Sequence, residues 1–185
     1  MNARALLLFV ALAWAWQPFD DAVRDVVQAS RRPWLEAPMH AVTNGARPLL
    51  VAGVVAGMLS GAAGRAAVLE AVVALVPVNL TVEVTKYATN RVRPNGDHKR
   101  RNSAFPSSHA ANAFAVAVLL TRRWKRAAVP AFVFAALVAY SRVYLNKHWA
   151  VDVIAGAALG AVLAHVTITA WRARLAARES GRAAA

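Results

Sequence analysis

The sequence predicts an all-α integral membrane protein in which six helices cross the bilayer as one bundle. Three observations support this class: 58% of the 185 residues are hydrophobic, the mean hydropathy is +0.39, and apolar stretches long enough to cross a bilayer recur along the chain. The length suits one domain. We expect that domain over residues 1–178 and a disordered tail over residues 179–185.

Each predicted crossing is defined by its apolar length and by the residues that end it. The six crossings run over residues 4–17, 46–60, 65–90, 107–121, 127–146 and 148–172. The first stretch has a basic start, as a signal peptide does, but Trp14 and Trp16 suit interfacial anchors and no clean small-residue cleavage site follows. We therefore expect this helix to be retained.

Between the first two crossings, residues 18–38 alternate apolar and charged side chains at helical spacing. The apolar set is Phe19, Val23, Val26 and Val27, and the charged set is Asp20, Asp21, Arg24 and Asp25. This pattern predicts an amphipathic helix that lies in the membrane interface. Such a helix serves either as a plain connector or as a lid over an entrance.

Small residues recur at every fourth position in two of the crossings. They are Gly53, Gly57 and Gly61 in the second crossing, and Gly156, Gly160 and Ala164 in the last. Because small residues at this spacing let helices approach closely in lipid, we expect them to form helix contacts.

The lysines and arginines of the short loops predict the orientation in the membrane. Arg4, Arg65, the basic residues of 122–126 and those of 172–182 fall on one side if the six crossings are right. Both termini are then cytoplasmic in a bacterial-type inner membrane. The two polar segments of the chain, residues 86–109 and 141–152, lie on the external face.

The net charge of +13 indicates an anionic partner, which is either nucleic acid or lipid. Nucleic acid is one candidate, but the basic residues lie at the ends of apolar segments, without interleaved aromatic residues on which bases would stack. Anionic lipid of the bilayer is the expected partner, and we expect neither nucleic acid nor an obligatory protein partner. The absence of cysteine excludes disulfides and thiolate metal sites.

Polar residues of the third crossing are predicted to share one helix face. They follow one another at steps of four and three: Asn79, Glu83, Lys86, Asn90 and Arg93. Lys86 and Arg93 then point the same way, until Pro94 stops the helix. Lys86 is either a ligand or a side chain that snorkels to the interface. Glu83 is expected to be a structural partner.

The sequence Pro-Ser-Ser-His directly precedes the fourth apolar segment. Ser107 is placed to cap that helix, so that the backbone N–H groups of Ser108 and His109 face an anion. A capped helix with an incidental histidine is the plainer interpretation. Asn112, one turn further on, either orients the His109 ring or bonds to a neighbouring helix.

The second polar segment contributes Arg142, His148 and Asp152. His148 and Asp152 lie one helical turn apart, so the carboxylate can hold one ring nitrogen protonated and leave the other as a nucleophile. The same pair could form part of a metal site, but too few further ligands lie nearby and the surrounding cations would repel a metal ion. We therefore expect no metal.

These three motifs resemble the signature of the type 2 phosphatidic acid phosphatase superfamily, in its membrane branch. The motifs are K-x6-RP from Lys86 to Pro94, PSSH from Pro106 to His109, and SR-x5-H-x3-D from Ser141 to Asp152. One departure is Ser108, where the family usually has glycine. Since serine supplies the same backbone N–H, we expect activity with a tighter approach of the substrate.

The resemblance implies a two-step phosphoryl transfer that needs no metal and no cofactor. His148 attacks phosphorus and forms a phosphohistidine, while Asp152 stabilises the charged ring. His109 protonates the departing oxygen and then activates the water that hydrolyses the intermediate.

The same resemblance assigns the phosphate-binding residues. The cations are Lys86, Arg93 and Arg142, and Ser107 and Ser108 complete the site at the helix N-terminus. Residues 95–101 match no part of the signature, and we expect them to select the headgroup or to attract anionic lipid.

The expected substrate is a membrane lipid phosphate or pyrophosphate, of the undecaprenyl pyrophosphate or phosphatidylglycerol phosphate type. A lipid A phosphatase and a lipid-to-lipid phosphotransferase are alternatives that use the same site. A polybasic module that only binds anionic lipid is the non-enzymatic alternative. Soluble vanadium haloperoxidases share the motif, but the apolar composition argues against them.

Overall fold

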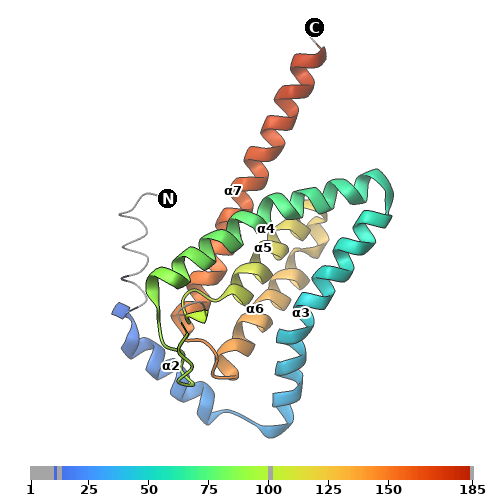
Figure 1. Cartoon of the computed structure of the whole chain (residues 1–185). Helices are drawn as coiled ribbons and strands as arrows, with labels where there is room; N and C mark the ends of the chain where they lie inside the picture. The colour runs from blue at the N-terminus through green and yellow to red at the C-terminus, as the bar shows by residue number, and fades with distance from the viewer. Residues whose placement is uncertain (1–10, 12–13, 100–101, 184–185) are drawn as a thin grey trace.

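The computed structural model describes residue 11 and residues 14–99 and 102–183. Within these residues every regular element is a helix. The order is α2 (Gln17–Ala29), α3 (Pro33–Leu59), α4 (Gly61–Thr89), α5 (Ser108–Arg123), the 3-10 turn η2 (Lys125–Ala127), α6 (Ala128–Tyr144) and α7 (Ala150–Ala183). The all-α class is therefore confirmed for the described part of the chain (Figure 1).

Four of the described helical segments are long and apolar enough to cross a membrane: α3, α4, η2 with α6, and α7. Large apolar side chains on their outer surfaces are exposed, such as Leu59 at 82% and Val129 at 74%, as expected where the surrounding solvent is lipid. The predicted first crossing lies largely outside the described residues, and α5 has 16 residues. A total of six crossings thus stays a prediction.

The segment over residues 18–38 is not one helix. The amphipathic helix α2 ends at Ala29, and α3 begins at Pro33, well before the predicted start at residue 46. Arg32 adopts an extended backbone, and the fixed φ of Pro33 suits the first turn of a new helix. The place of α2 in the membrane interface stays a prediction.

The division of α2 into one apolar and one charged face, which the sequence predicts, is only partly right. Val23 and Val27 of the apolar set pack against the bundle, but Val26 of the same set is 71% exposed and Asp20 of the charged set is fully buried. Residues 20, 23 and 27 are spaced by three and four, so they share the face that meets the bundle.

The end of α4 also differs from the prediction. The helix stops at Thr89, because Asn90 adopts a left-handed conformation with φ 47° and its N–H donates to the Lys86 carbonyl. Arg93 therefore lies in the connection from α4 to α5 and not on the face of α4 that carries Lys86.

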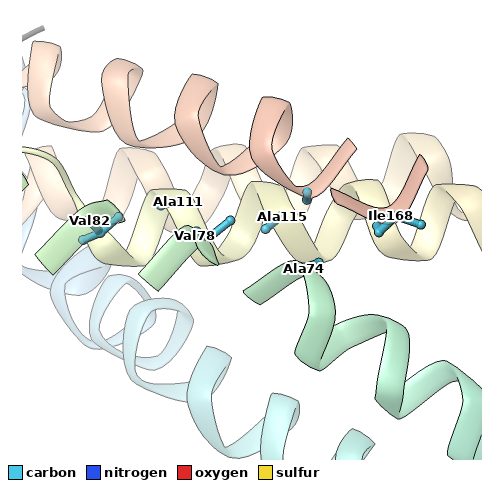
Figure 2. Packing of buried hydrophobic residues seen from close by; sticks show 7 residues of the cluster. Ala74, Val78, Val82, Ala111, Ala115 and Ile168 are labelled. Atoms are coloured by element: carbon cyan, nitrogen blue, oxygen red, sulfur yellow. The ribbon is translucent and has the colours of Figure 1, made fainter. Parts of the chain in front are cut away.

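Helix α5 lies in the middle of the bundle and packs against α4, α6 and α7. Figure 2 shows the core where α4, α5 and α7 meet. Its buried members are Ala74, Val78, Val82, Ala111, Ala115, Ala164 and Ile168. Small side chains dominate this list, which allows the helix axes to approach closely.

The glycines of α7 make the contact with α5, which confirms their predicted role. A Cβ atom on Gly160 would lie 2.0 Å from the Ala111 carbonyl oxygen, and one on Gly156 would lie 2.5 Å from that of Ser107. In α3, Gly57 packs closely against α4, whereas nothing lies within 4 Å of a Cβ on Gly53.

One end of the bundle gathers four features: helix α2, the end of α4, the start of α5 and the turn from α6 to α7 (Figure 1). At the other end, α7 projects beyond the bundle and continues as a helix to Ala183. The described part of the expected disordered tail, residues 179–183, is therefore helical, and residues 184 and 185 lie outside the described residues. The candidate site lies at the end that holds α2.

Candidate active site

The connection from α4 to α5 folds back on itself and is held by buried hydrogen bonds. The Ala104 N–H donates to the Arg91 carbonyl at 2.9 Å, and the Arg91 N–H donates to Ser103 Oγ at 2.8 Å. Thr89 Oγ1 donates to the Phe105 carbonyl at 3.0 Å. These bonds fix the Ala104 carbonyl beside the turn between α6 and α7.

His148 lies in that turn and is 2% exposed. Its Nδ1 is 2.7 Å from the Ala104 carbonyl oxygen and 3.6 Å from Asp152 Oδ2. Because a carbonyl oxygen can only accept, Nδ1 carries the proton and Nε2 keeps its lone pair. Burial lowers the pKa of His148 to about 4, against the opposing effect of Asp152. The ring is therefore neutral near pH 7, as a nucleophile requires.

Asp152 is fully buried and has more partners than the sequence suggested. Oδ2 accepts from the Trp149 N–H at 2.8 Å, and Oδ1 accepts from Arg91 Nη1 at 2.7 Å. The closest acceptor for His148 Nδ1 is thus the Ala104 carbonyl, with the Asp152 carboxylate as a more distant neighbour. A histidine held by a backbone carbonyl cannot be recognised from residue types.

Sequence reasoning did not single out Arg91 and Asp20. Arg91 is 1% exposed and Asp20 0%, and Arg91 Nη2 lies 2.7 Å from Asp20 Oδ2. Burial raises the pKa of Asp20, while the Val151 N–H and the Arg91 guanidinium oppose that rise. One signal was available for Arg91, since it is a charged residue inside the polar segment of residues 86–109. Asp20 gave none beyond its place in an amphipathic pattern.

Two of the predicted phosphate ligands, Arg93 and Arg142, are buried near His148. Arg142 Nη1 donates to Thr43 Oγ1 of α3 at 2.9 Å, and Arg93 donates to the side chain of Asn102 at 2.6 Å. Burial lowers the pKa of Arg93. Arg93 Nη1 donates to the Lys147 carbonyl at 3.3 Å, and the His148 N–H donates to the Arg142 carbonyl at 3.2 Å. The charges of both guanidiniums disfavour protonation of His148.

The predicted residues Lys86, Ser108 and His109 line one end of a cavity of about 1190 Å³ between α3, α4 and α5. Lys86 Nζ is 3.7 Å from Glu83 Oε1, which is the structural pairing expected for Glu83. From this polar end the cavity continues along mainly apolar walls to Arg123 and Trp124 at the far end of α5.

Ser107 connects the two groups of site residues. Its side chain accepts from the Ala110 N–H at 3.5 Å, as the predicted N-cap of α5, and its own N–H donates to the Asp152 carbonyl at 2.9 Å. Asn112 bonds to Asn79 of α4 through two amide hydrogen bonds of 2.9 and 3.0 Å, so it joins neighbouring helices.

The residues around His148 are suited to an anion. Arg93 and Arg142 supply positive charge, and the described residues include no group of three His, Cys, Asp or Glu side chains that could hold a metal ion. Long apolar helices and a buried histidine with two buried arginines at one end of the bundle are the features of a membrane protein with a cluster of buried polar residues at that end.

Comparison with known proteins identifies the family. The family model of the PAP2 superfamily matches residues 67–176. The chain is 32% identical over 165 residues to phosphatidylglycerophosphatase B of Bacillus subtilis (strain 168), with 80% of this chain and 81% of that protein covered. The protein belongs to the PAP2 superfamily.

Other relatives share shorter regions. The chain is 36% identical over 83 residues to lipid A 1-phosphatase of Porphyromonas gingivalis, with 43% of this chain and 18% of that protein covered. It is 35% identical over 97 residues to undecaprenyl-diphosphatase of Sulfolobus acidocaldarius, with 46% of each covered. The chain thus spans less than half the length of both relatives.

A crystal structure of a transmembrane PAP2-type phosphatidylglycerolphosphate phosphatase from Bacillus subtilis has a similar fold. The TM-score is 0.70 at 27% identity, and the alignment covers 92% of this chain and 95% of that one. The likeness extends over nearly the whole chain.

Proposed function

We propose that the protein is a membrane lipid phosphatase that works through a phosphohistidine at His148. The observation that carries this proposal is the environment of the His148 ring, which keeps the ring neutral and holds it in one orientation. The ring is buried, its Nδ1–H is held by Ala104, its pKa is lowered to about 4, and the guanidiniums of Arg93 and Arg142 act on it. A neutral imidazole beside fixed cations is what an attack on a phosphate anion requires.

In the first step, Nε2 of His148 forms a bond to phosphorus and the bond from phosphorus to the lipid oxygen breaks. His109 donates a proton to that departing oxygen. Nδ1 keeps its proton, so the phosphorylated ring is positively charged and is stabilised by Asp152. Lys86, Arg93 and Arg142 bind the equatorial phosphate oxygens.

In the second step, a water molecule attacks the phosphohistidine. His109, now neutral, takes a proton from the water, the bond from phosphorus to Nε2 breaks, and inorganic phosphate leaves. Ser107 and Ser108 contribute the N-terminus of α5, where backbone N–H groups and the helix dipole favour an anion. These assignments follow the family signature and fit the chemistry of each residue.

The cavity supports a lipid as the substrate. Its polar end carries Lys86 and His109, and its apolar walls continue between α3, α4 and α5, which suits a phosphate headgroup joined to a hydrocarbon tail. The names of the relatives add support, because they include a phosphatidylglycerophosphatase, a lipid A 1-phosphatase and an undecaprenyl-diphosphatase. We propose a polyprenyl pyrophosphate or phosphatidylglycerol phosphate as the preferred class, with residues 95–101 beside the headgroup. Residues 100 and 101 of this segment lie outside the described residues.

We also propose that the protein lies in an inner membrane with the site on the external face and both termini in the cytoplasm. The basic cluster at residues 122–126 supports this orientation, because it lies at the end of α5 away from the site. The bilayer and the lipid substrate are the partners that this proposal needs.

The test is phosphate release by purified protein from a panel of lipid phosphates and pyrophosphates, with the His148→Ala variant as control. We expect release from at least one lipid by the wild-type protein and none by the variant. If no lipid yields phosphate above the level of His148→Ala, the proposed function is wrong.

A further inference from the structure

A buried ionic network lies behind His148, on the side of α2. It comprises Asp20, Arg91 and Asp152, with exposed fractions of 0%, 1% and 0%. We propose that Arg91 and Asp20 are positioning residues for His148: Arg91 holds both acceptors that face the Nδ1 atom, and Asp20 holds Arg91. This inference rests on the proposed function, in which His148 is the nucleophile.

The side chain of Arg91 holds the first acceptor, the Asp152 carboxylate. Arg91 Nη1 donates to Asp152 Oδ1 at 2.7 Å, and the other oxygen, Oδ2, lies 3.6 Å from His148 Nδ1. The guanidinium is also 5.6 Å from the ring centroid of Trp149, whose backbone N–H donates to Oδ2. These contacts fix the orientation of the carboxylate.

The backbone of Arg91 holds the second acceptor, the Ala104 carbonyl. The Arg91 carbonyl accepts from the Ala104 N–H at 2.9 Å, and the Arg91 N–H donates to Ser103 Oγ at 2.8 Å. The oxygen of Ala104 then accepts from His148 Nδ1 at 2.7 Å. A single residue therefore sets the position of both groups that contact the protonated ring nitrogen.

Helix α2 holds Arg91 from the opposite side. Arg91 Nη2 donates to Asp20 Oδ2 at 2.7 Å and to Gln17 Oε1 at 3.0 Å. Asp20 Oδ1 also accepts from the Val151 N–H at 2.8 Å, directly before Asp152 in the chain. Asp20 thus contacts both the guanidinium and the first turn of α7.

The charges of the network explain why a second carboxylate is useful. Arg91 alone would neutralise Asp152, whereas Asp20, Arg91 and Asp152 together carry one net negative charge. That charge matches the positive charge that the His148 ring acquires when Nε2 bonds to phosphorus and Nδ1 keeps its proton. Three buried charges are costly, so a role in stabilising the charged intermediate accounts for a network that burial alone would disfavour.

The deciding variant is Asp20→Asn, with Asp21→Asn as the matched control. Asp21 is the next residue, it is exposed, and it contacts Gln17 Nε2 at 3.0 Å. Neither variant touches the substrate, so KM should stay constant in both. We expect kcat to fall roughly 10- to 100-fold in Asp20→Asn, as for other residues that orient a reacting group, and less than about twofold in Asp21→Asn.

A loss of kcat could also come from a smaller folded fraction, so the inhibition constant of orthovanadate is measured as well. Vanadate adopts the geometry of the transition state, and its inhibition constant does not depend on how much enzyme is active. If Asp20 positions His148, this constant rises in Asp20→Asn by a factor similar to the loss of kcat. If it stays at the wild-type value, Asp20 has only a structural role and the inference is overturned.

The charged groups that act on the His148 ring are Asp152, Arg93 and Arg142. A change in any of them would also change the inhibition constant of vanadate. The substitutions leave all three in place. If Asp20→Asn does not fold, Gln17→Leu decides, because it removes one partly buried contact with Arg91. We expect a rise of about two- to tenfold in the vanadate constant for this variant, and an unchanged constant would overturn the inference.

His148→Ala separates this inference from the proposed function. If His148→Ala turns over lipid phosphate at the wild-type rate, the nucleophile is wrong and the inference falls with it. If His148→Ala is inactive while Asp20→Asn and Asp21→Asn behave alike, the proposed function stands and the inference alone is wrong.

Discussion

The Nδ1 atom of His148 lies 2.7 Å from the carbonyl oxygen of Ala104. This carbonyl belongs to the connection between α4 and α5, so the ring of the proposed nucleophile is oriented by a segment 44 residues away in the chain. A backbone acceptor fixes the tautomer of His148 whatever residue stands at position 152.

The first prediction concerns Asp152→Asn. In serine proteases, loss of the orienting aspartate costs about 10⁴-fold in kcat because the histidine adopts the wrong tautomer. Here Ala104 still holds the Nδ1 proton, so we expect a smaller loss of kcat, on the order of 10²-fold. Steady-state kinetics with a water-soluble short-chain lipid phosphate checks this. A loss as complete as that of His148→Ala would show that Ala104 does not fix the ring.

The second prediction concerns protonation of His148. Burial lowers its pKa from 6.5 to about 4. The ring should therefore stay neutral as the pH falls through 6.5 and should take up a proton only near pH 4. In the unfolded chain, His148 takes up this proton near pH 6.5. The difference in pKa therefore lowers the free energy of unfolding as the pH falls from about 6.5 to about 4, and it has no effect at higher pH. Histidine-selective NMR in detergent micelles, with His148→Gln to assign the signal, measures the midpoint. A midpoint at or above 6.5 would contradict the burial described for this ring.

The third prediction is that activity persists in EDTA. Lys86, Arg93 and Arg142 are expected to supply the positive charge that a metal ion provides in many phosphoryl-transfer enzymes. Phosphate release should therefore be the same before and after dialysis against the chelator. Loss of activity that is restored by magnesium would argue strongly against this mechanism.

The fourth prediction uses two glycines with different surroundings. A Cβ on Gly156 would lie 2.5 Å from the Ser107 carbonyl oxygen and 3.2 Å from its nitrogen. Backbone atoms cannot move aside easily, so Gly156→Ala should cost about 1–3 kcal/mol and should also lower kcat by displacing Ser107. The thermal midpoint in detergent and the rate of phosphate release are the measurements.

Gly53→Ala is the matched control for that substitution. Nothing lies within 4 Å of a Cβ at this position of α3, and alanine favours a helix more than glycine does. The thermal midpoint should therefore stay the same or rise slightly. Equal losses in the two variants would show that the contact between α7 and Ser107 is not what matters.

The sequence was sufficient where the chemistry is local. Each of the three motifs is a short segment, and the spacing of four residues predicts that His148, in the turn before α7, lies close to Asp152 of its first turn. The cap at Ser107 and the glycine contacts of α7 were also predictable, because they depend on residue type and helical periodicity.

The remaining features depend on contacts between distant segments. In the sequence, Asp20 is one of four charged residues of an amphipathic pattern, and only the packed bundle shows that it meets Arg91, 71 residues later. The Ala104 carbonyl has no signature in the sequence, since every residue has such a group. The early end of α4 had an available signal in Asn90, because asparagine tolerates the left-handed conformation that terminates a helix.

The central claim is that His148 carries the phosphoryl group during turnover. The most direct measurement mixes the enzyme with a lipid phosphate that carries radioactive phosphorus, stops the reaction with alkaline detergent, and locates the label by peptide mapping. We expect label on the peptide that contains His148, and none in His148→Ala. Label on a different residue, or rapid turnover with no label on His148, would contradict the claim.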